Sequence, residues 1–539
     1  MKCVLVSPPF SSPFSPPLGV LSVGAYLRAQ GVEVAVIDAS IDALHHRLAP
    51  ERTPPAAREL LREIRTADGF RLDPARHDAQ LEAIDGALTL STGGGGAPAL
   101  RLGGYDEPVS SFAPGADPFL GYYGDALVPA VAAAAPDVIG ISIGYHQQAA
   151  FAAAIIAELG RALPGVPIVT GGAFVSSLCV ELRPPSGGVV PLVAGRPSQA
   201  DLLASLIDTA AVGGEGEAPM AEICRAIAGG RPLDGIPGSV RVDRASRALE
   251  FAPEAAPLTG AALPSLDLSG LPIGRRYLGR VRAAPLMASR GCYWNRCAFC
   301  DHAALLDSRF RELPLETVLA TLRRYRGEHG IEYAFFCDEG MAPKTISRLA
   351  DGISRERLGV RFGTMARFER ALERIVPRAA EGGLSFLSFG LEATSPRVLE
   401  AMRKGYAPDT ALRILDACER CGVAVELFVM FGFPGETREE AQATVRFLEE
   451  NAARIAVLRP NPWYLTLKSP IGADLARFGV VPVAGGPVSN DPSTYRLERG
   501  MGFEESAALV RSLRENPVLG DKIVHSYFNE EYFALRGPA

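Results

Sequence analysis

The segment Arg290-Gly-Cys-Tyr-Trp-Asn-Arg-Cys-Ala-Phe-Cys-Asp301 places three cysteines, Cys292, Cys297 and Cys300, within nine residues. It directly follows the apolar run Pro285–Ser289, which predicts a β-strand. On one continuous helix Cys292 and Cys297 would point about 140° apart, so the spacing favours a loop that wraps around a shared ligand. Soft thiolates suit iron–sulfur clusters or zinc. A structural zinc site usually takes four ligands, and only three are present locally, so the segment indicates an iron–sulfur cluster with one open iron.

Two other interpretations of this segment stay open: a zinc site completed by a distant ligand (His302 is nearby), and three unrelated thiols. The chain has nine cysteines, an odd count that fits a reducing compartment, where clustered cysteines indicate metal or redox chemistry.

A β/α repeat extends outward from this segment, starting near Ala284. Strand-like runs lie at Pro285–Ser289, Tyr333–Cys337, Val360–Met365, Ser385–Gly390, Val423–Phe431 and Ile455–Leu458. Helical runs between them include Leu315–Arg326, Thr345–Gly352, Pro396–Met402, Thr410–Arg420 and Arg438–Glu450. About six such units predict a partial or full parallel (β/α) barrel over residues 284–470, with its site at the carboxyl ends of the strands.

The first 230 residues have the pattern of a doubly wound, Rossmann-like α/β domain. Apolar strands are predicted at Cys3–Ser7, Val32–Asp38, 137–144 and Val166–Thr170, and helices at Leu18–Gln30 and Gln147–Leu163. Ligands of such sheets bind outside the carboxyl ends of the strands. In this chain those ends carry prolines and glycines, and small residues allow close approach to the backbone.

Three further regions complete the predicted organisation. An irregular insertion at about 41–136 includes one helix, Ala56–Ile64, and the run Gly93–Gly96, which we interpret as a flexible loop because no Gly-Lys-Ser/Thr follows it. Residues 231–283 are predicted to be a linker with a small hairpin at Ser239–Val242 and Ala248–Phe251. Residues 471–539 form a C-terminal extension without a clear repeat.

Composition excludes several classes of protein. The 539 residues include 55 basic and 61 acidic side chains, and the net charge of −6 disfavours a nonspecific nucleic-acid binder. No apolar run approaches the ~20 residues needed to span a bilayer, and the first apolar stretch ends at Pro8-Pro9. We therefore expect a cytoplasmic protein with no membrane or nucleic-acid partner.

The cysteine segment and the strand ends after it resemble the radical S-adenosylmethionine (SAM) superfamily. That family usually shows Cys-x3-Cys-x2-Cys with an aromatic residue before the last cysteine; Phe299 fits, while the first spacing here is four residues, which a loop can absorb as a bulge. Phe335–Glu339, Phe389–Ser395 and Phe431–Thr437 resemble its SAM-contacting segments in the same order. The resemblance implies SAM contacts from Asp338, Glu339, Arg367, Glu392, Thr394, Ser395, Gly432 and Pro434.

The first domain resembles the cobalamin-binding domain that precedes many radical enzymes. The Asp-x-His-x-x-Gly signature of a lower-ligand histidine is absent, because Asp42, His45 and His46 lack its spacing and its glycine. The resemblance implies cobalamin contacts from Pro9, Phe10, Tyr145, His146, Gly171, Gly172, Gly214, Glu215 and Gly216, with His146 or Tyr145 near the lower face. A polar residue at a helix start is the alternative interpretation of His146, and a solvated helix start that of Glu215.

Together the resemblances imply a radical SAM enzyme in which Cys292, Cys297 and Cys300 ligate a 4Fe-4S cluster that cleaves SAM and allows hydrogen abstraction from an unactivated carbon. The favoured activity is cobalamin-dependent C-methylation of a small-molecule or peptide substrate, with flavodoxin or ferredoxin as reductant. Three alternatives remain: a cobalamin-containing radical cyclase or rearrangement enzyme, a radical peptide-modifying enzyme whose first domain is a scaffold, and a noncatalytic metal-binding scaffold. No residue of the chain is assigned as catalytic, and the insertion and C-terminal tail are where substrate contacts are expected.

Overall fold

The computed structural model describes residues 1–66, 69–73, 76–92, 100–102, 104–105, 116–184, 187–192, 198–273, 276–279, 282–305, 309–483, 486 and 488–523. These residues divide into two compact units. The first comprises the described residues of Met1–Pro285 with Gly327–Ile331, and the second comprises Leu286–Arg326 and the described residues of Glu332–Ile523.

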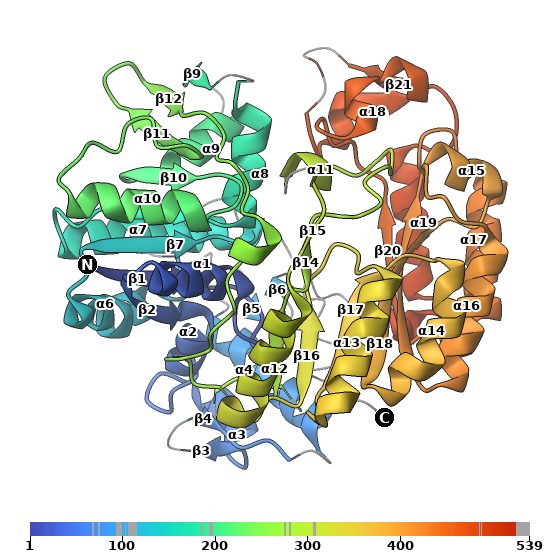
Figure 1. Ribbon diagram of the computed structural model, residues 1–539, viewed down its shortest axis with the longest axis horizontal. Helices are drawn as coiled ribbons and strands as arrows, with labels where there is room; N and C mark the ends of the chain where they lie inside the picture. Colours follow the sequence, from blue (N-terminus) through green and yellow to red (C-terminus); the bar gives the residue numbers. More distant parts are fainter. Residues whose placement is uncertain are drawn as a thin grey trace. The chain divides into compact units, whose positions relative to one another are not determined.

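An eight-stranded sheet organises the first unit, in the order β2-β1-β7-β8-β10-β11-β12-β9 (Figure 1). Its strands are β1 (Lys2–Ser7), β2 (Glu33–Asp38), β7 (Val138–Ser142), β8 (Ile168–Gly171), β9 (Gly188–Pro191), β10 (Ala210–Val212), β11 (Ser239–Asp243) and β12 (Ala248–Phe251). The first five strands of this order are parallel, in the 2-1-3-4-5 arrangement of doubly wound folds. The predicted hairpin is present as β11 and β12, and it extends this sheet through antiparallel pairing.

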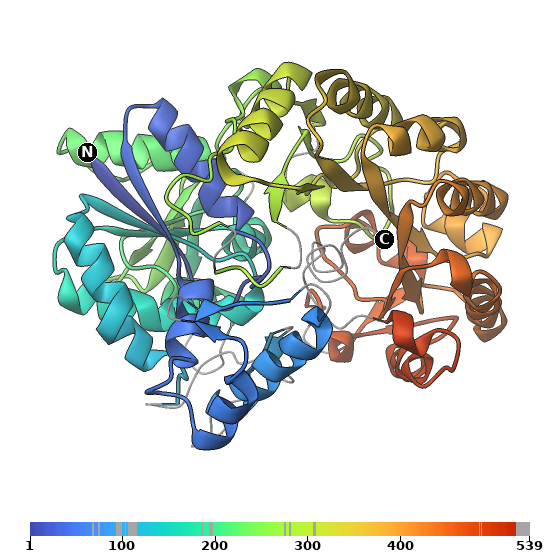
Figure 2. The same ribbon diagram turned by 90° about the horizontal axis from the view of Figure 1, so that it is seen from below.

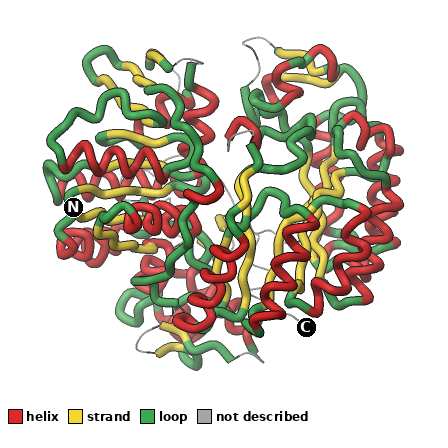
Figure 3. Tube along the Cα trace, in the orientation of Figure 1, coloured by secondary structure: helices red, strands yellow, loops and turns green. Residues whose placement is uncertain are grey.

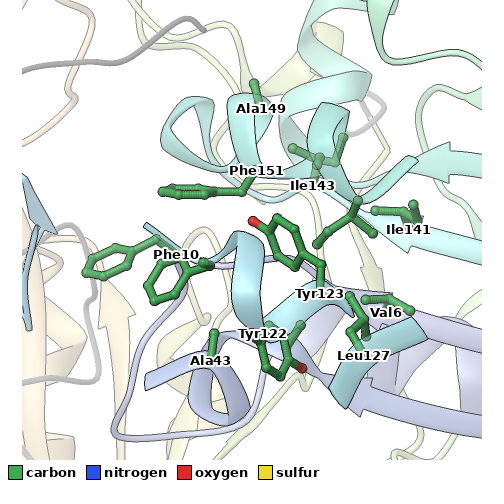
Figure 4. Close-up of a cluster of buried hydrophobic side chains, with 14 of the residues drawn as sticks. Val6, Phe10, Ala43, Tyr122, Tyr123, Leu127, Ile141, Ile143, Ala149 and Phe151 are labelled. Atoms are coloured by element: carbon green, nitrogen blue, oxygen red, sulfur yellow. The ribbon is translucent and has the colours of Figure 1, made fainter. Parts of the chain in front are cut away.

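Helices cover both faces of this sheet because side chains alternate along its strands. Cys3 and Leu5 on β1 pack with α1 (Leu18–Ala29) and α10 (Glu217–Ala228). On the opposite face, Val4 and Val6 pack into a larger core with α7 (Ala149–Ala162) and α8 (Ala173–Leu182). Figure 4 shows part of this core, with Tyr123 among Val6, Ile141 and Phe151. The doubly wound prediction is therefore confirmed.

The insertion is more regular than predicted. It contains α2 (Ala39–Arg47), α3 (Pro55–Leu61), α4 (His77–Thr92), α5 (Leu120–Tyr122), a π-helical turn (Tyr123–Leu127), α6 (Val128–Ala134) and the short hairpins β3–β4 (Arg65–Thr66, Gly69–Phe70) and β5–β6 (Leu100–Arg101, Gly104–Tyr105). The predicted helix Ala56–Ile64 is present as α3, whereas the other helices were not predicted. Among them, α4 carries an apolar face, Leu81, Ile84 and Leu88, that lies among polar residues in the sequence. The run Gly93–Gly96 lies outside the described residues.

A six-stranded parallel sheet organises the second unit, in the order β13-β16-β17-β18-β19-β20. Its strands are β13 (Ala283–Leu286), β16 (Tyr333–Phe336), β17 (Arg361–Ala366), β18 (Leu384–Glu392), β19 (Ala424–Phe431) and β20 (Val457–Pro462). Its helices are α12 (Leu315–His329), α13 (Pro343–Glu356), α14 (Arg370–Glu381), α15 (Pro396–Ala401), α16 (Pro408–Arg420) and α17 (Arg438–Glu450). In Figure 2 these helices form an outer arc around the strands, and Figure 3 shows the alternation of helix and strand. The arrangement is a partial barrel. Of these six helices, only α14, which contains Pro377, was not predicted from the sequence.

Shorter elements complete the second unit. They are β14 (Ser289–Arg290), which pairs with β15 (Arg311–Glu312), α11 (His302–Leu305), α18 (Pro470–Ala473), β21 (Val480–Pro482), β22 (Tyr495–Leu497) and α19 (Phe503–Arg514). Among the described residues, none of the helices combines the length and apolar character required to cross a bilayer.

Candidate functional site

The cysteine segment is a loop, as its spacing predicted. Residues 291–300 run through bends and turns after β14, and Cys292, Cys297 and Cys300 are each half-buried. Asn295 has φ +45°, a left-handed conformation that asparagine tolerates better than most residues.

Aromatic side chains fix the loop at two points. The Tyr293 hydroxyl donates to Glu369 Oε1 at 2.6 Å, and Trp294 Nε1 donates to the Arg403 carbonyl at 2.9 Å. The Trp294 ring lies so close to Gly405 that a Cβ there would come within 2.3 Å of it, and Gly405 also has φ +73°. A glycine is therefore required at position 405.

Asp338 fixes the strand end that leads into the loop. It is fully buried, and its carboxylate accepts from the Ala288 N–H at 3.0 Å and from the Ser289 hydroxyl. Burial raises the pKa of Asp338 to about 7, although the hydrogen bond from Ser289 opposes this shift. Asp338 was predicted to contact SAM, but both of its carboxylate oxygens accept hydrogen bonds from Ala288 and Ser289.

Three buried charged groups gather beside the second cysteine, at the ends of β17 and β18. Arg367 Nη1 lies 3.8 Å from Cys297 Sγ, and Arg367 Nη2 donates to the Lys404 carbonyl. Lys404 Nζ lies 3.1 Å from Glu392 Oε1, with both side chains about 90% buried. Burial raises the pKa of the Cys297 thiol, while the positive charges of Lys404 and Arg367 oppose that shift.

Glu392 and Gly390 form an irregular end to β18. Glu392 has φ +59°, and the register with β19 shifts between Gly390 and Glu392. A Cβ at Gly390 would lie 2.3 Å from Glu392 Oε1, so the glycine leaves room for the carboxylate. Strained backbone of this kind is typical of functional sites.

Glu339, at the end of β16, carries a buried Oε2 that has no hydrogen-bond partner among the described residues. The next residue, Gly340, lies beside the cysteine loop, since a Cβ there would be 3.7 Å from Cys292 Sγ. A buried carboxylate oxygen without a donor is costly, so a ligand that donates to it would be stabilised.

The remaining predicted SAM contacts have structural partners. Ser395 caps α15, and its hydroxyl donates to Glu440 Oε1 at 2.7 Å, while the Thr394 N–H donates to the Thr444 hydroxyl at 3.1 Å. Gly432 has φ +80°, and its N–H donates to Glu436 Oε2 at 2.6 Å. Pro434 is buried in the same turn. These residues shape the chain at the ends of β18 and β19.

In the first unit, the predicted cobalamin contacts lie at the carboxyl ends of adjacent parallel strands. Pro9 and Phe10 follow β1, while Tyr145 and His146 follow β7 and are exposed. Gln148 connects the two ends, because its Nε2 donates to the Pro8 carbonyl at 2.7 Å and its Oε1 accepts from the Gly144 N–H at 2.7 Å. The chain order reverses between β1 and β7, which is where doubly wound sheets bind their ligands.

Glycines open the rest of this edge. Gly172 has φ +100°, and a Cβ there would lie 2.4 Å from the Ile143 carbonyl. Gly171 ends β8, while Gly214 and Gly216 follow β10 and lead into α10. Two predicted contacts have other roles: Phe10 is 7% exposed in the core, and Glu215 accepts from the Leu258 N–H at 3.0 Å. Partial burial lowers the pKa of His146.

Two residues of these sites, Lys404 and Gln148, were not among the predicted contacts. Lys404 was not predicted, because its pairing with Glu392 depends on the fold of β18. Gln148 lies four residues after the predicted strand 137–144, which is close enough for its side chain to bond to the backbone at the end of that strand. Among the described residues, no group of three or more His, Cys, Asp or Glu side chains converges as around a single metal ion. An iron–sulfur cluster carries its thiolate ligands on different irons, so they need not converge on one ion.

Comparison with known proteins relates this arrangement to a family. Residues 286–448 match the family model of the Radical SAM superfamily. An uncharacterized methyltransferase from Pyrococcus horikoshii is 30% identical over 259 residues, 47% of this chain and 56% of that protein. The bacteriochlorophyllide d C-12(1)-methyltransferase from Chlorobaculum tepidum is 25% identical over 187 residues, 33% of this chain and 40% of that protein. The chain thus spans about half the length of these curated relatives.

Two solved structures share the fold over most of the chain. The radical SAM methyltransferase TsrM from Kitasatospora setae, solved with cobalamin and a 4Fe-4S cluster, has a TM-score of 0.58 at 17% identity and covers 90% of this chain and 81% of its own. The cobalamin-dependent SAM radical enzyme OxsB has a TM-score of 0.61 at 15% identity and covers 95% of this chain and 66% of its own.

Proposed function

We propose that this chain, whose residues 286–448 match the family model of the Radical SAM superfamily, is a radical SAM enzyme and, more specifically, a cobalamin-dependent methyltransferase that methylates carbon. Cys292, Cys297 and Cys300 would hold a 4Fe-4S cluster, and the strand ends beside them would bind SAM. The observation that carries the proposal is the half-buried loop of three cysteines, surrounded by charged groups at three successive strand ends.

The residues present fit SAM. Its methionyl ammonium is a donor that suits the unpartnered Oε2 of Glu339. The paired Lys404 and Glu392 offer opposite charges to a zwitterionic ligand. Arg367 fits less well as a SAM contact, because one guanidinium nitrogen donates to Lys404 and its plane lies over Trp294.

The cofactors supply the difficult chemistry when bound: a reduced cluster with SAM provides a carbon radical that removes hydrogen, and methylcobalamin provides the methyl group. The chain's own residues hold these partners in place. Asp338 holds the strand end that leads into the cysteine loop, and Trp294 anchors the loop itself. The buried surroundings of Glu392 and Lys404 limit access of water. A flavodoxin or ferredoxin would serve as reductant, and the substrate would be a small molecule or a peptide.

The carboxyl edge of the first unit fits cobalamin. A corrin is a wide ring that needs close backbone approach, and Gly171, Gly172 and Gly214 lie at neighbouring strand ends. Tyr145 and His146 are exposed there and are candidates for its lower face. The cobalamin in the TsrM and OxsB structures and the methyltransferase names of the curated relatives support this assignment.

Anaerobic reconstitution tests the proposal in stages. The wild-type chain should bind about four irons, as a single 4Fe-4S cluster requires. It should show a corrinoid absorption band, and with its substrate it should release both 5′-deoxyadenosine and S-adenosylhomocysteine. Release of 5′-deoxyadenosine without S-adenosylhomocysteine, with the true substrate, would exclude methyl transfer. Serine at Cys292, Cys297 or Cys300 should abolish iron binding. The matched control is Cys418→Ser, because Cys418 lies in α16 and is not part of the loop.

A further inference from the structure

The spacer between Cys292 and Cys297 is one residue longer than the usual family pattern, and its side chains make specific contacts. Asn295, the third spacer residue, has a left-handed φ of +45°. Trp294, the second spacer residue, reaches the Arg403 carbonyl and the surface of Gly405. The spacer therefore binds to the segment that follows α15.

Trp294 and the Lys404 carbonyl together orient Arg367. The guanidinium carbon of Arg367 lies 4.2 Å from the centre of the Trp294 ring, a cation–π distance. Its Nη2 donates to the Lys404 carbonyl, and the residue is 9% exposed. Held on two sides, the guanidinium directs Nη1 to Cys297 Sγ at 3.8 Å.

The charge of Arg367 is not cancelled by a carboxylate in the part of the chain that the structure describes. No ion pair of Arg367 occurs there, whereas the neighbouring cation Lys404 is paired with Glu392. A guanidinium stays protonated at every accessible pH, and buried charges are screened little by salt. Cys297 therefore faces one permanent, desolvated positive charge.

We propose that the spacer loop holds Arg367 against the Cys297 sulfur in order to raise the reduction potential of the iron–sulfur cluster. This inference rests on the proposed function, because it requires the cluster to be there. Reduction adds one negative charge to the cluster and its thiolates, so a fixed cation beside one ligand stabilises the reduced state. Net charge and hydrogen bonds to sulfur are known determinants of such potentials. Arg367 acts through Cys297 and is thus a positioning residue for electron transfer.

The test is a redox titration of the reconstituted full-length chain, followed by electron paramagnetic resonance, with iron and sulfide content measured in parallel. Arg367→Gln and Arg367→Met remove the positive charge, whereas Arg367→Lys keeps the charge and removes the planar guanidinium. Both neutral variants should keep the wild-type iron content and destabilise the reduced cluster about tenfold, which is about 59 mV for one electron. The lysine variant should lie between them and the wild type. Arg378→Gln, on the exposed face of α14, is the matched control and should keep the wild-type potential.

Two results would overturn the inference: neutral variants that bind full iron at the wild-type potential, or a lysine variant with the same potential as the neutral ones. If Arg367→Gln loses the cluster, Arg367→Met, which better preserves the volume, decides the question, and loss of iron in both would assign Arg367 to holding the loop instead. An iron-free wild-type chain would overturn the proposed function itself, and so the two failures are distinguishable.

Discussion

Asp338→Asn should remove a pH dependence of stability that originates at the base of the cysteine loop. Asparagine keeps the shape and the acceptor for the Ala288 N–H, but it cannot ionise. The pKa of Asp338 is about 7 in the folded chain, raised by burial from 3.8. Between these values the folded chain keeps a proton that the unfolded chain releases, so stability is highest at low pH and falls as pH rises.

The size of the effect follows from the pKa difference. About three pH units at 1.36 kcal/mol each give a loss of roughly 4 kcal/mol across the whole interval. Between pH 5 and 7 the loss is roughly 2 kcal/mol, because the folded-state group is already half ionised at pH 7. The difference in unfolding free energy, wild type minus Asp338→Asn, should therefore decrease by that amount from pH 5 to 7 and then level off above pH 7.

The assay is urea unfolding under reducing, metal-free conditions, followed by tryptophan fluorescence. The chain has two tryptophans, Trp294 and Trp463, and both lie in the second unit, so the signal reports on the unit that contains Asp338. Asp351→Asn is the matched control, because the Asp351 carboxylate on α13 is partly exposed, and it should keep the wild-type pH profile. A profile for Asp338→Asn that runs parallel to the wild type would refute the reasoning.

Three further substitutions test other parts of the structure. Gly405→Ala should displace the Trp294 ring and destabilise the second unit by more than the ~1–2 kcal/mol that a left-handed backbone costs alanine. In a Trp463→Phe background, the fluorescence of Trp294 should shift to longer wavelength. Glu339→Gln should weaken SAM binding about tenfold, or ~1.4 kcal/mol, by isothermal titration calorimetry, because the ammonium loses a charged acceptor. Gln148→Ala should lower the local stability of β1 and β7 by roughly 2 kcal/mol in hydrogen exchange and reduce corrinoid retention.

Each of these has a control or a contradicting result. Gly422→Ala has a similar φ of +66° but no atom within 4 Å of its Cβ, so an equal loss of stability in both glycine variants would contradict the collision with Trp294. Glu381→Gln, at the exposed end of α14, should bind SAM normally, and unchanged SAM affinity of Glu339→Gln would exclude the ammonium contact. Normal exchange rates in Gln148→Ala would show that the β1 and β7 ends do not need the bridge.

The sequence predicted architecture better than side-chain roles. Strands such as β19 and β18 were found because apolar runs bounded by glycine or proline are a local signal. α14 was not named, since Pro377 interrupts its pattern, and α4 was overlooked because its apolar residues are sparse. Elements with a strong local period were therefore the ones that could be predicted.

Partner choice depends on the fold and is much harder to predict. Ser395 and Glu215 are polar residues at strand ends, as ligand contacts often are, yet their side chains bond to Glu440 and to the Leu258 backbone. Conversely, the stacking of Arg367 on Trp294 joins residues 73 positions apart, and no local pattern encodes that distance in space. The three cysteines were predictable because a short spacing delivers them to one loop whatever the rest of the chain does.

The most direct test of the account is the iron content and the reduced-state paramagnetic resonance spectrum of the anaerobically reconstituted chain, with and without SAM. The account predicts one 4Fe-4S cluster per chain and a spectrum that changes when SAM is added, because one iron has no protein ligand. Each of Cys292→Ser, Cys297→Ser and Cys300→Ser should lose the cluster and, with it, the response of the spectrum to SAM. A wild-type chain without iron, or a cluster that survives all three serine substitutions, would contradict it.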